Sequence, residues 1–391
     1  MDGGLPPATG FDCTTLEKFA LFGRGSDRTT DEGLPPMSSV ASTAQPVTPD
    51  SETVWFTAGD GMSLNLIHAR GDKPATRGPV LVVHGAGVRA NLFRPPSGRT
   101  IVDALLADGY DVWLENWRAS IDLPANRWTL DQAALYDHPH AVETVVRETG
   151  ADRIKAIIHC QGSTSFMMSA VAGLVPKVDT IISNAVSLHP RIPKETEMKF
   201  RLALPVLARL LDFLDPHWGV EAPTLLAKLI TLWVKATHHE CDNTVCRLVS
   251  FTYGVGFPTL WSHANLNDAT HDWIKQEFAK VPVTFFQQIY QCVLAGHLVS
   301  VDGLAGLPAD YGVRPPETDA RFVFFAGQQN HCFLPESQTA TFEYFERHRP
   351  AYHALHVLPD YGHLDVFIGK NAATDIFPLM LAELDKPNQG G

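Results

Sequence analysis

Short runs of apolar residues recur along the chain and alternate with stretches whose apolar positions follow a helical period. Residues 80–83 read Val-Leu-Val-Val, a continuous run typical of a strand that is buried on both faces. Strands that alternate with helices are joined by right-handed crossovers into a parallel sheet. The pattern therefore predicts an α/β fold with a mostly parallel, doubly wound sheet. The predicted strands are 80–83, 112–114, 154–158, 180–183, 321–325 and 354–358, and the predicted helices between them include 101–107, 140–149 and 164–172.

A different pattern precedes this α/β region. Two short alternating runs, 53–56 and 64–68, flank a Gly-Asp-Gly turn and predict a β-hairpin. Residues 1–50 are rich in Pro, Gly, Ser, Thr and Asp, so we expect a flexible or loosely docked leader. Within it, residues 16–22 could form one or two helical turns.

The alternation of strands and helices is also interrupted in the second half of the chain. Residues 190–317 are mostly helical in pattern, with apolar positions at helical spacing in 198–213 and 224–235. Strand signals return only afterwards. We therefore predict a core made of residues 51–189 and 318–391, interrupted by a helical cap at 190–317.

The composition is typical of a folded protein, and the net charge argues against two classes of binding partner. Hydrophobic residues make up 45% and charged residues 19% of the chain, which supplies a packed core. The net charge of −12 argues against a nucleic-acid partner and against electrostatic docking on an anionic membrane. No apolar run of about 18 residues predicts a spanning helix. Six scattered cysteines and a start without the pattern of a signal peptide predict a protein of the reducing cytoplasm.

The clearest chemical signal is Cys160, which follows His159 at the junction of a predicted strand and a predicted helix. Such a turn strains the backbone of a nucleophile and presents its side chain above the sheet, and Gly162 supplies the small residue that the turn needs. The helix N-terminus favours the thiolate. The usual pattern is G-x-S-x-G, but here Cys160 replaces Ser and Ile158 replaces the first Gly. Ser163 is a rival nucleophile inside the helix, and a buried structural role for Cys160 remains the alternative.

His363 is the predicted general base, because it follows the last predicted strand and can reach the edge of the sheet where Cys160 lies. Asn330, after the strand at 321–325, is the best candidate to orient it. An amide costs a serine enzyme about 10⁴-fold in rate, but in a thiolate–imidazolium pair both ring nitrogens donate, so an amide oxygen suffices. Glu336 is a weaker alternative orienter, and Asn330 could instead be a plain turn residue.

An oxyanion hole is predicted from the turn His84-Gly85-Ala86-Gly87, which follows the strand at 80–83. A turn of this type places backbone N–H groups beside the nucleophile. We expect the N–H groups of Ala86 and Gln161 to stabilise a tetrahedral oxyanion.

Histidines and cysteines also gather at His238, His239, Cys241 and Cys246. The C-x₄-C spacing has no convincing second pair at zinc-finger spacing. We therefore predict no metal, and expect helix packing or an optional local disulfide at these positions.

Aromatic residues are frequent near the predicted site and in the cap. Those of the cap are expected mainly in its core, although some could line an acyl pocket. The residues expected to buttress the site are Asn116, Trp117 and Arg118, and the tryptophans of the cap are Trp218, Trp233, Trp261 and Trp273.

Taken together, these features resemble the α/β-hydrolase superfamily, specifically its acid-lipase-like branch. Over about residues 50–385 the chain is most similar to the hydrolase module of some glucose-methanol-choline oxidoreductases of the cholesterol-oxidase type. The resemblance rests on the phrases ENWRAS at 115–120, HCQGS at 159–163, LNDATH at 266–271 and YGHLD at 361–365. It implies acyl-ester chemistry on apolar substrates. No G-x-G-x-x-G flavin fingerprint is present, and we predict no cofactor.

Three functions stay open at this point. The first is hydrolysis of a small apolar ester or thioester, in which Cys160 carries the acyl group as a thioester and His363 moves the protons. The second is acyl transfer, condensation or cyclisation through the same thioester. The third is a binding protein that has the fold without catalysis. The sequence does not indicate the oligomeric state.

Overall fold

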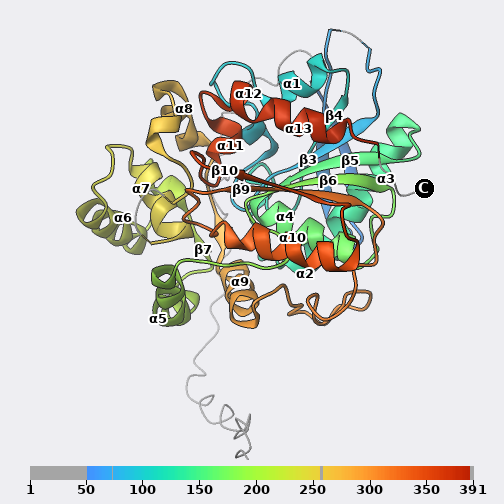
Figure 1. Cartoon of the computed structure of the whole chain (residues 1–391). Helices are drawn as coiled ribbons and strands as arrows, with labels where there is room; N and C mark the ends of the chain where they lie inside the picture. The colour runs from blue at the N-terminus through green and yellow to red at the C-terminus, as the bar shows by residue number, and fades with distance from the viewer. Residues whose placement is uncertain (1–50, 73, 256–258, 388–391) are drawn as a thin grey trace, which may run out of the picture. The chain divides into compact units, whose positions relative to one another are not determined.

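The computed structural model describes residues 51–72, 74–255 and 259–387, and its centre is an eight-stranded sheet (Figure 1). The strands are ordered β1-β2-β4-β3-β5-β6-β9-β10. Strand β2 is antiparallel to both of its neighbours, β1 and β4. From β4 to β10, neighbouring strands run parallel to one another. The predicted leader 1–50, with its turn at 16–22, lies outside the described residues. The bounds are β1 Ser51–Thr57, β2 Ser63–Ala69, β3 Pro79–Val83, β4 Asp111–Asn116, β5 Ile154–His159, β6 Val178–Asn184, β9 Arg321–Gly327 and β10 Ala354–Leu358.

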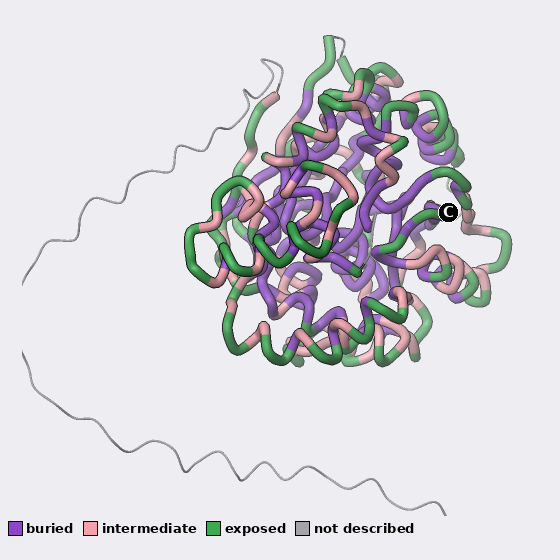
Figure 2. Tube along the Cα trace, turned by 90° about the vertical axis from the view of Figure 1, so that its left-hand side faces the viewer, coloured by how far each residue is buried: buried purple, intermediate pink, exposed green. Residues whose placement is uncertain are grey.

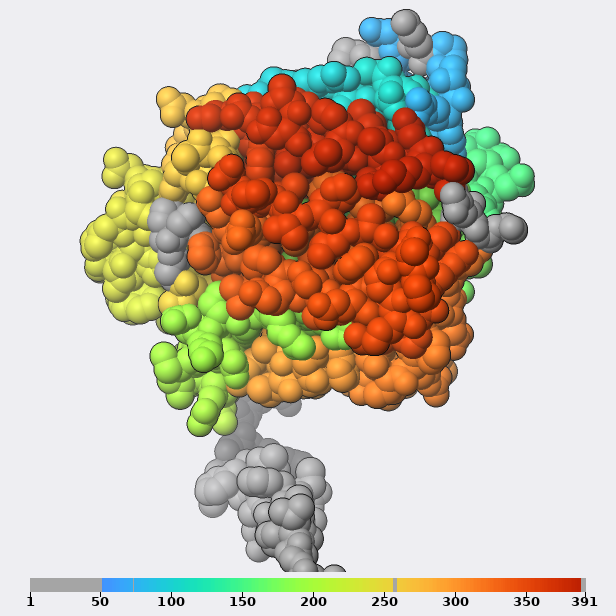
Figure 3. Space-filling view, in the orientation of Figure 1, coloured from blue at the N-terminus to red at the C-terminus, as the bar shows by residue number. Residues whose placement is uncertain are grey.

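Helices cover both faces of this sheet. The pair α1 and α13 lies on one face, and α4 and α10 lie on the other (Figure 1). In Figure 3 the orange and red atoms of the chain after residue 320 cover the face toward the viewer. The helices of the core are α1 Ile101–Ala107, α2 Leu130–Gln132, α3 His138–Thr149, α4 Cys160–Val171, α10 Glu336–His348, α11 Asp365–Ile368, α12 Ala372–Asp375 and α13 Phe377–Leu384.

The mostly parallel, doubly wound sheet predicted from the sequence is confirmed, and each predicted strand lies within an observed one. The central strands β3 and β9 are buried along their whole length, as a continuous apolar run requires. The start of one helix differs from the prediction, and it bears on the candidate nucleophile. Helix α4 begins at Cys160 itself rather than at residue 164, so the candidate nucleophile is the first helical residue after β5.

The segment between β6 and β9, residues 185–320, is called the insertion below. Its helices α5 to α8 gather beyond one end of the sheet, at the left of Figure 1, and Figure 2 looks onto them. A small antiparallel pair, β7 Phe213–Leu214 with β8 Val281–Pro282, was not predicted. The helices are α5 Lys194–Leu210, α6 Leu225–Thr237, α7 Thr244–Tyr253, α8 Asp268–Trp273 and α9 Val283–Ala295, and a short 3₁₀ turn spans His263–Asn265.

Two helices of the insertion expose rows of apolar side chains. On α5 the exposed positions recur every fourth residue, so they form one stripe along the helix. On α6 they follow a similar spacing. The exposed side chains are Met198, Leu202, Val206 and Leu210 on α5, and Leu225, Leu229, Leu232 and Trp233 on α6. None of the helices within the described ranges is both long and apolar enough to cross a membrane.

Candidate active site

Cys160 lies at a sharp turn between β5 and α4. Its φ is 56°, which falls in the left-handed region that a residue with a side chain rarely adopts. Backbone strain of this kind persists only where the surrounding structure enforces it, and it is concentrated at functional sites. Ile158 is fully buried between Val83 of β3 and Ser183 of β6, so the bulky side chain before the turn fits as an ordinary strand residue.

Two glycines allow the backbone to pass close to this turn. A Cβ on Gly162 would lie 2.2 Å from the carbonyl oxygen of His84. A Cβ on Gly85 would lie 2.8 Å from the Cβ and 3.1 Å from the sulfur of Cys160. Both approaches are closer than van der Waals contact permits, so only glycine leaves room for the turn after β3 beside the nucleophile.

That turn directs backbone donors at the sulfur. The N–H groups of Ala86 and Gln161, the two predicted for an oxyanion hole, both lie beside the thiol of Cys160 and act to lower its pKa. The turn is held from the insertion, because the hydroxyl of Tyr253 donates to the carbonyl of Ala86 over 2.9 Å. Gly87 has a φ of 67°, and a Cβ there would collide with Val281 and with the Tyr253 hydroxyl.

Residues after β4 support the same turn from the core. The indole N–H of Trp117 donates to the carbonyl of His84 over 2.9 Å, and the side-chain oxygen of Asn116 accepts from the N–H of Ala90. Arg118 forms a buried ion pair with Asp137. His84 itself is fully buried, and burial lowers its pKa to about 3. These residues lie behind the site as supports.

His363 meets Cys160 in space although 203 positions separate them in the sequence. The Cys160 sulfur and a ring nitrogen each of His159 and His363 all lie within 4.8 Å of one another. The loop of His363 is fixed through its backbone, because its carbonyl accepts from the amide of Asn184 and the next N–H donates to Leu260. Neither ring nitrogen of His363 has a hydrogen-bond partner among the described residues.

The third member of the predicted triad, Asn330, is therefore not hydrogen-bonded to the ring of His363. The side-chain oxygen of Asn330 accepts from the N–H groups of Cys332 and Phe333, each over 3.0 Å, and so closes its own loop. Glu336 lies exposed in the first turn of α10. In this structure the site is a Cys–His pair without an orienting side chain, and turn chemistry accounts for Asn330.

A neighbour that sequence reasoning missed is Asn184, the last residue of β6. Its amide donates to Nδ1 of His159 over 2.9 Å and to the carbonyl of His363 over 3.1 Å. Its place at the carboxyl end of the strand beside β5 was the available signal. The rival nucleophile Ser163 is buried within α4, and its hydroxyl is hydrogen-bonded to that of Ser183.

Burial governs the protonation of the pair. It raises the pKa of the Cys160 thiol to about 12, although the N–H groups of Gln161 and Ala86 act in the opposite direction. It lowers the pKa of His363 to about 3. The resting pair is thus a neutral thiol and a neutral imidazole. The N-terminus of α4 was expected to favour a thiolate–imidazolium pair, and in this structure desolvation acts against it as the larger effect.

Two narrow apolar cavities reach the sulfur. One, of about 20 Å³, is lined by aromatic side chains of the insertion, and the other, of about 10 Å³, lies beside His363. Each holds at most about one water molecule. Phenylalanines and a tyrosine of the insertion line the first cavity, and none of the described tryptophans lines either one. The aromatic lining of the first is Phe200, Tyr253, Phe285, Phe286 and Phe333.

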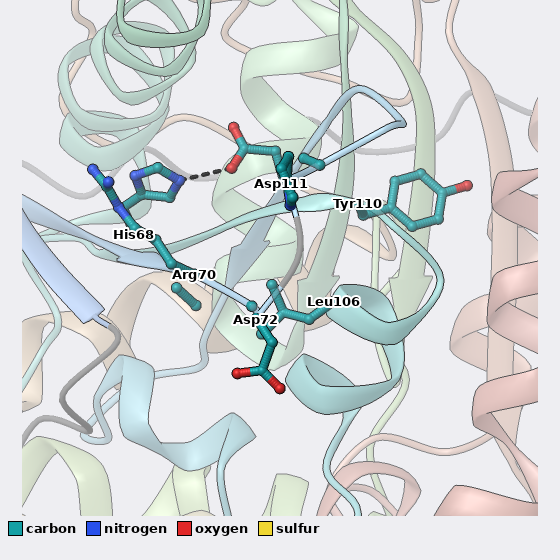
Figure 4. Close-up of a pocket in the computed structure, with 10 residues that line it drawn as sticks. His68, Arg70, Asp72, Leu106, Tyr110 and Asp111 are labelled. Carbon is teal, nitrogen blue, oxygen red and sulfur yellow. Dashed lines mark hydrogen bonds and ion pairs between the residues drawn. The ribbon is translucent and has the colours of Figure 1, made fainter.

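A wider hollow of about 440 Å³ lies elsewhere, and Figure 4 shows its lining. His68 and Asp111 are hydrogen-bonded there over 2.7 Å, and the His68 ring stacks on Trp113. Asp111 is the first residue of β4, so this hollow lies at the sheet edge opposite Cys160. The other polar side chains of its lining include Arg70, which pairs with Glu52, and Tyr110, which donates to Asp385; we assign this hollow no chemistry.

Two clusters of Cys and His could hold a metal ion among the residues that the structure describes. The first consists of His159, Cys160 and His363. The second, which we call the insertion cluster, is not part of this site and consists of Cys241, Cys246, His263 and His271.

No family model matches this chain. It is 25% identical over 167 residues to sterol esterase 2 of Saccharomyces cerevisiae, covering 36% of this chain and 31% of that protein. It is 23% identical over 360 residues to lipase member K of Homo sapiens, covering 82% and 84% respectively. The chain thus spans about a third of the sterol esterase and most of the lipase.

The solved structure of an epoxide hydrolase from Vigna radiata superposes with a TM-score of 0.53 at 14% sequence identity, covering 86% of this chain and 99% of that one. At this identity the likeness concerns the fold alone. The chain has the α/β-hydrolase fold, as the sequence predicted.

Proposed function

We propose that this protein hydrolyses ester or thioester bonds of an apolar acyl substrate through a thioester on Cys160. The sulfur attacks the carbonyl carbon while His363 accepts the thiol proton. The resulting tetrahedral oxyanion is stabilised by the N–H groups of Ala86 and Gln161. His363 then gives its proton to the leaving alcohol or thiol as the bond to carbon breaks. Water, deprotonated by His363, attacks the thioester and releases the acid and the thiol.

One observation carries this proposal. Cys160 stands at a strained, left-handed position with two backbone N–H groups directed at its sulfur and the His363 ring beside it. A buried structural cysteine needs neither the strain nor the donors. The likeness to an esterase and a lipase supports the same chemistry.

We propose that residues 190–317 act as a cap over this site. The space beside the sulfur is apolar and too small for an acyl chain, and Phe200 and Phe285 of the insertion close it. Opening of the cap would bring water to the pair and reverse the desolvation that keeps it neutral. An apolar acyl group would take the place of these side chains.

The test is to trap the acyl group. A series of nitrophenyl esters with acyl chains of increasing length is mixed with the full chain, and nitrophenolate release is followed from the first turnover. We expect a burst of one product per site, and a mass increase equal to the acyl group on the peptide that carries Cys160.

Cys332 provides a matched control, since it is buried and lines the same cavity as Cys160. Cys332→Ser should keep the burst, and Cys160→Ala should lose both the burst and turnover. Full turnover by Cys160→Ala would exclude the mechanism. No turnover of any ester by the folded wild-type chain would favour a binding protein instead.

Acyl transfer is the second candidate, and the apolar surroundings of the sulfur favour it. A thioester kept from water is passed to an alcohol or amine instead of being hydrolysed. Adding such an acceptor to the ester assay distinguishes the two, because transfer gives a new ester, amide or lactone in place of free acid. The similarity to a cholesterol-oxidase-type module, the cytoplasmic location and the lack of a cofactor stay predictions.

A further inference from the structure

Four thiol and imidazole side chains converge in the insertion. None of them belongs to the group of His159, Cys160 and His363. Cys241 lies in the loop after α6, Cys246 in the first turn of α7, His263 in a 3₁₀ turn and His271 in α8. One ligand atom from each lies within 4.8 Å of all the others.

The contacts within this insertion cluster match the spacing of a tetrahedral site. The sulfur of Cys241 contacts the side chains of Cys246, His263 and His271. The sulfur of Cys246 lies 3.4 Å from Nε2 of His263. Zinc binds sulfur at about 2.3 Å and nitrogen at about 2.1 Å, which separates neighbouring ligand atoms by about 3.6 Å in a tetrahedron. The observed distance therefore leaves room for zinc among the ligands.

A second feature points to a ligand. Nε2 of His271 is shielded from solvent and has no hydrogen-bond partner in the described part of the chain. A buried ring nitrogen without a partner is costly, and a metal bond would satisfy it. The structure has Cys241 and Cys246 as free thiols, so they remain available as ligands.

The backbone around the cluster is held in place by Asn243. Its side-chain oxygen accepts from the N–H groups of Val245 and Cys246, and its amide donates to the carbonyl of His271 over 2.6 Å. One side chain thus links the loop of the two cysteines to the helix of the second histidine. Support of this kind fixes metal ligands before the ion binds.

We propose that Cys241, Cys246, His263 and His271 bind one structural zinc ion. Two thiolates and two imidazoles form a closed tetrahedral set that leaves no position for substrate, so the ion would stabilise the fold rather than react. This replaces the expectation of no metal. The sequence did not predict this site because His263 and His271 follow Cys246 at separations that differ from those of zinc fingers.

The ion would also fasten the segment that holds the active-site loop. Beside His263, the N–H of Ser262 and the amide of Asn265 both donate to Asp365, two residues after His363. The carbonyl of Leu260 accepts from the N–H of Leu364. Zinc would therefore tie α7 and α8 to the chain that positions the catalytic histidine.

The first experiment measures metal content of the purified full chain by mass spectrometry of the elements. We expect about one zinc ion per wild-type chain. Cys241→Ser and His271→Ala, both at half-buried positions, should lose most of it. Cys292→Ser, which removes a fully buried thiol elsewhere in the insertion, and Cys160→Ser should keep it. Wild-type protein with no stoichiometric metal, or variants with undiminished zinc, would overturn the proposal.

Cobalt substitution separates metal loss from misfolding. The wild-type chain with Co²⁺ should show the visible bands and thiolate charge-transfer absorption of a tetrahedral site, and Cys160→Ser should show the same spectrum. Intact mass with and without reductant then tests the pair directly. A disulfide between Cys241 and Cys246 in the protein as isolated would exclude zinc there.

Discussion

Two groups of thiols and imidazoles in this chain differ in how the backbone presents them. Cys160 stands at a left-handed turn and receives two backbone N–H groups, whereas no residue of the insertion cluster has a positive φ in the described ranges. The first group offers three atoms beside narrow cavities, and the second offers four that surround one point. We propose that the same residue types provide a nucleophile in one place and metal ligands in the other. The number of ligands and the strain of the backbone decide which.

When one of the two groups is mutated at a time, the largest expected effect is on catalysis. His363→Ala should lower kcat for nitrophenyl esters by about 10⁴-fold, because the thiol loses its proposed general base. His271→Ala, the corresponding change in the insertion cluster, should lower it by less than about tenfold while zinc is lost. Steady-state rates and metal content of both variants check this. Equal losses of activity would show that the two groups act together.

Removal of zinc should have the next largest effect, and on stability. At free zinc about 1,000 times the Kd, binding contributes about 4 kcal/mol to the free energy of unfolding. A strong chelator should therefore lower that free energy by a similar amount in urea unfolding. Cys241→Ser should be insensitive to the chelator. A chelator response in that variant equal to the wild-type response would place the effect elsewhere.

A smaller change tests the close approach at the nucleophile. In Gly85→Ala the new Cβ must push against the Cβ and sulfur of Cys160, which displaces the sulfur from the N–H donors. We expect kcat/KM to fall about 10²-fold with zinc content unchanged. Gly78→Ala is the control, since nothing lies within 4 Å of its added Cβ. An active Gly85→Ala would mean that the donors do not need this geometry.

Acid should weaken the core around Cys160 through its buried histidines. Burial lowers the pKa of His363 to about 3, below an unfolded value of about 6.5. The unfolded chain therefore binds more protons in this window, so stability is fully present above about pH 6.5 and falls as pH drops toward 3. Each such proton contributes about 1.4 kcal/mol per pH unit. Urea unfolding of His363→Gln between pH 6 and 4 should show a slope that is shallower by this amount.

The smallest effect concerns Asn330. Its removal costs the hydrogen bonds to the N–H groups of Cys332 and Phe333, so Asn330→Ala should lower the free energy of unfolding by about 1 kcal/mol. Activity should fall less than about tenfold, and Asn330→Asp, which keeps the acceptor, should restore stability. A loss near 10⁴-fold would instead show that Asn330 orients His363 in the working enzyme.

The sequence predicted the sheet well because buried parallel strands leave a continuous apolar signature. It also predicted that Cys160 and His363 would lie close together, since both follow parallel strands whose carboxyl ends share one edge. The role of Asn330 could not be read from it, because a turn residue and an orienter have the same identity. The neutral state of the pair depends on burial, and side chains far away in the sequence, such as Phe200 and Phe285, line the cavity beside the sulfur. That packing has no local signal.

The insertion cluster could not be predicted from the sequence either, for a related reason. Sequence spacing reveals a metal site only when its ligands come from one short motif. Here His263 and His271 meet Cys241 and Cys246 only in the folded chain, where one ligand atom of each lies within 4.8 Å of the others. The neighbouring His238 and His239 drew attention instead, although neither belongs to the cluster.

The exposed apolar stripes of α5 and α6 have a practical consequence for anyone who handles the protein. Surfaces of this kind adsorb to plastic and to detergent micelles. Long-chain substrates are usually dispersed with detergents. A kinetic experiment with them would therefore measure a protein whose helices α5 and α6 are covered by detergent. Rates compared across additives, and stocks kept dilute, would distinguish solubility artefacts from substrate preference.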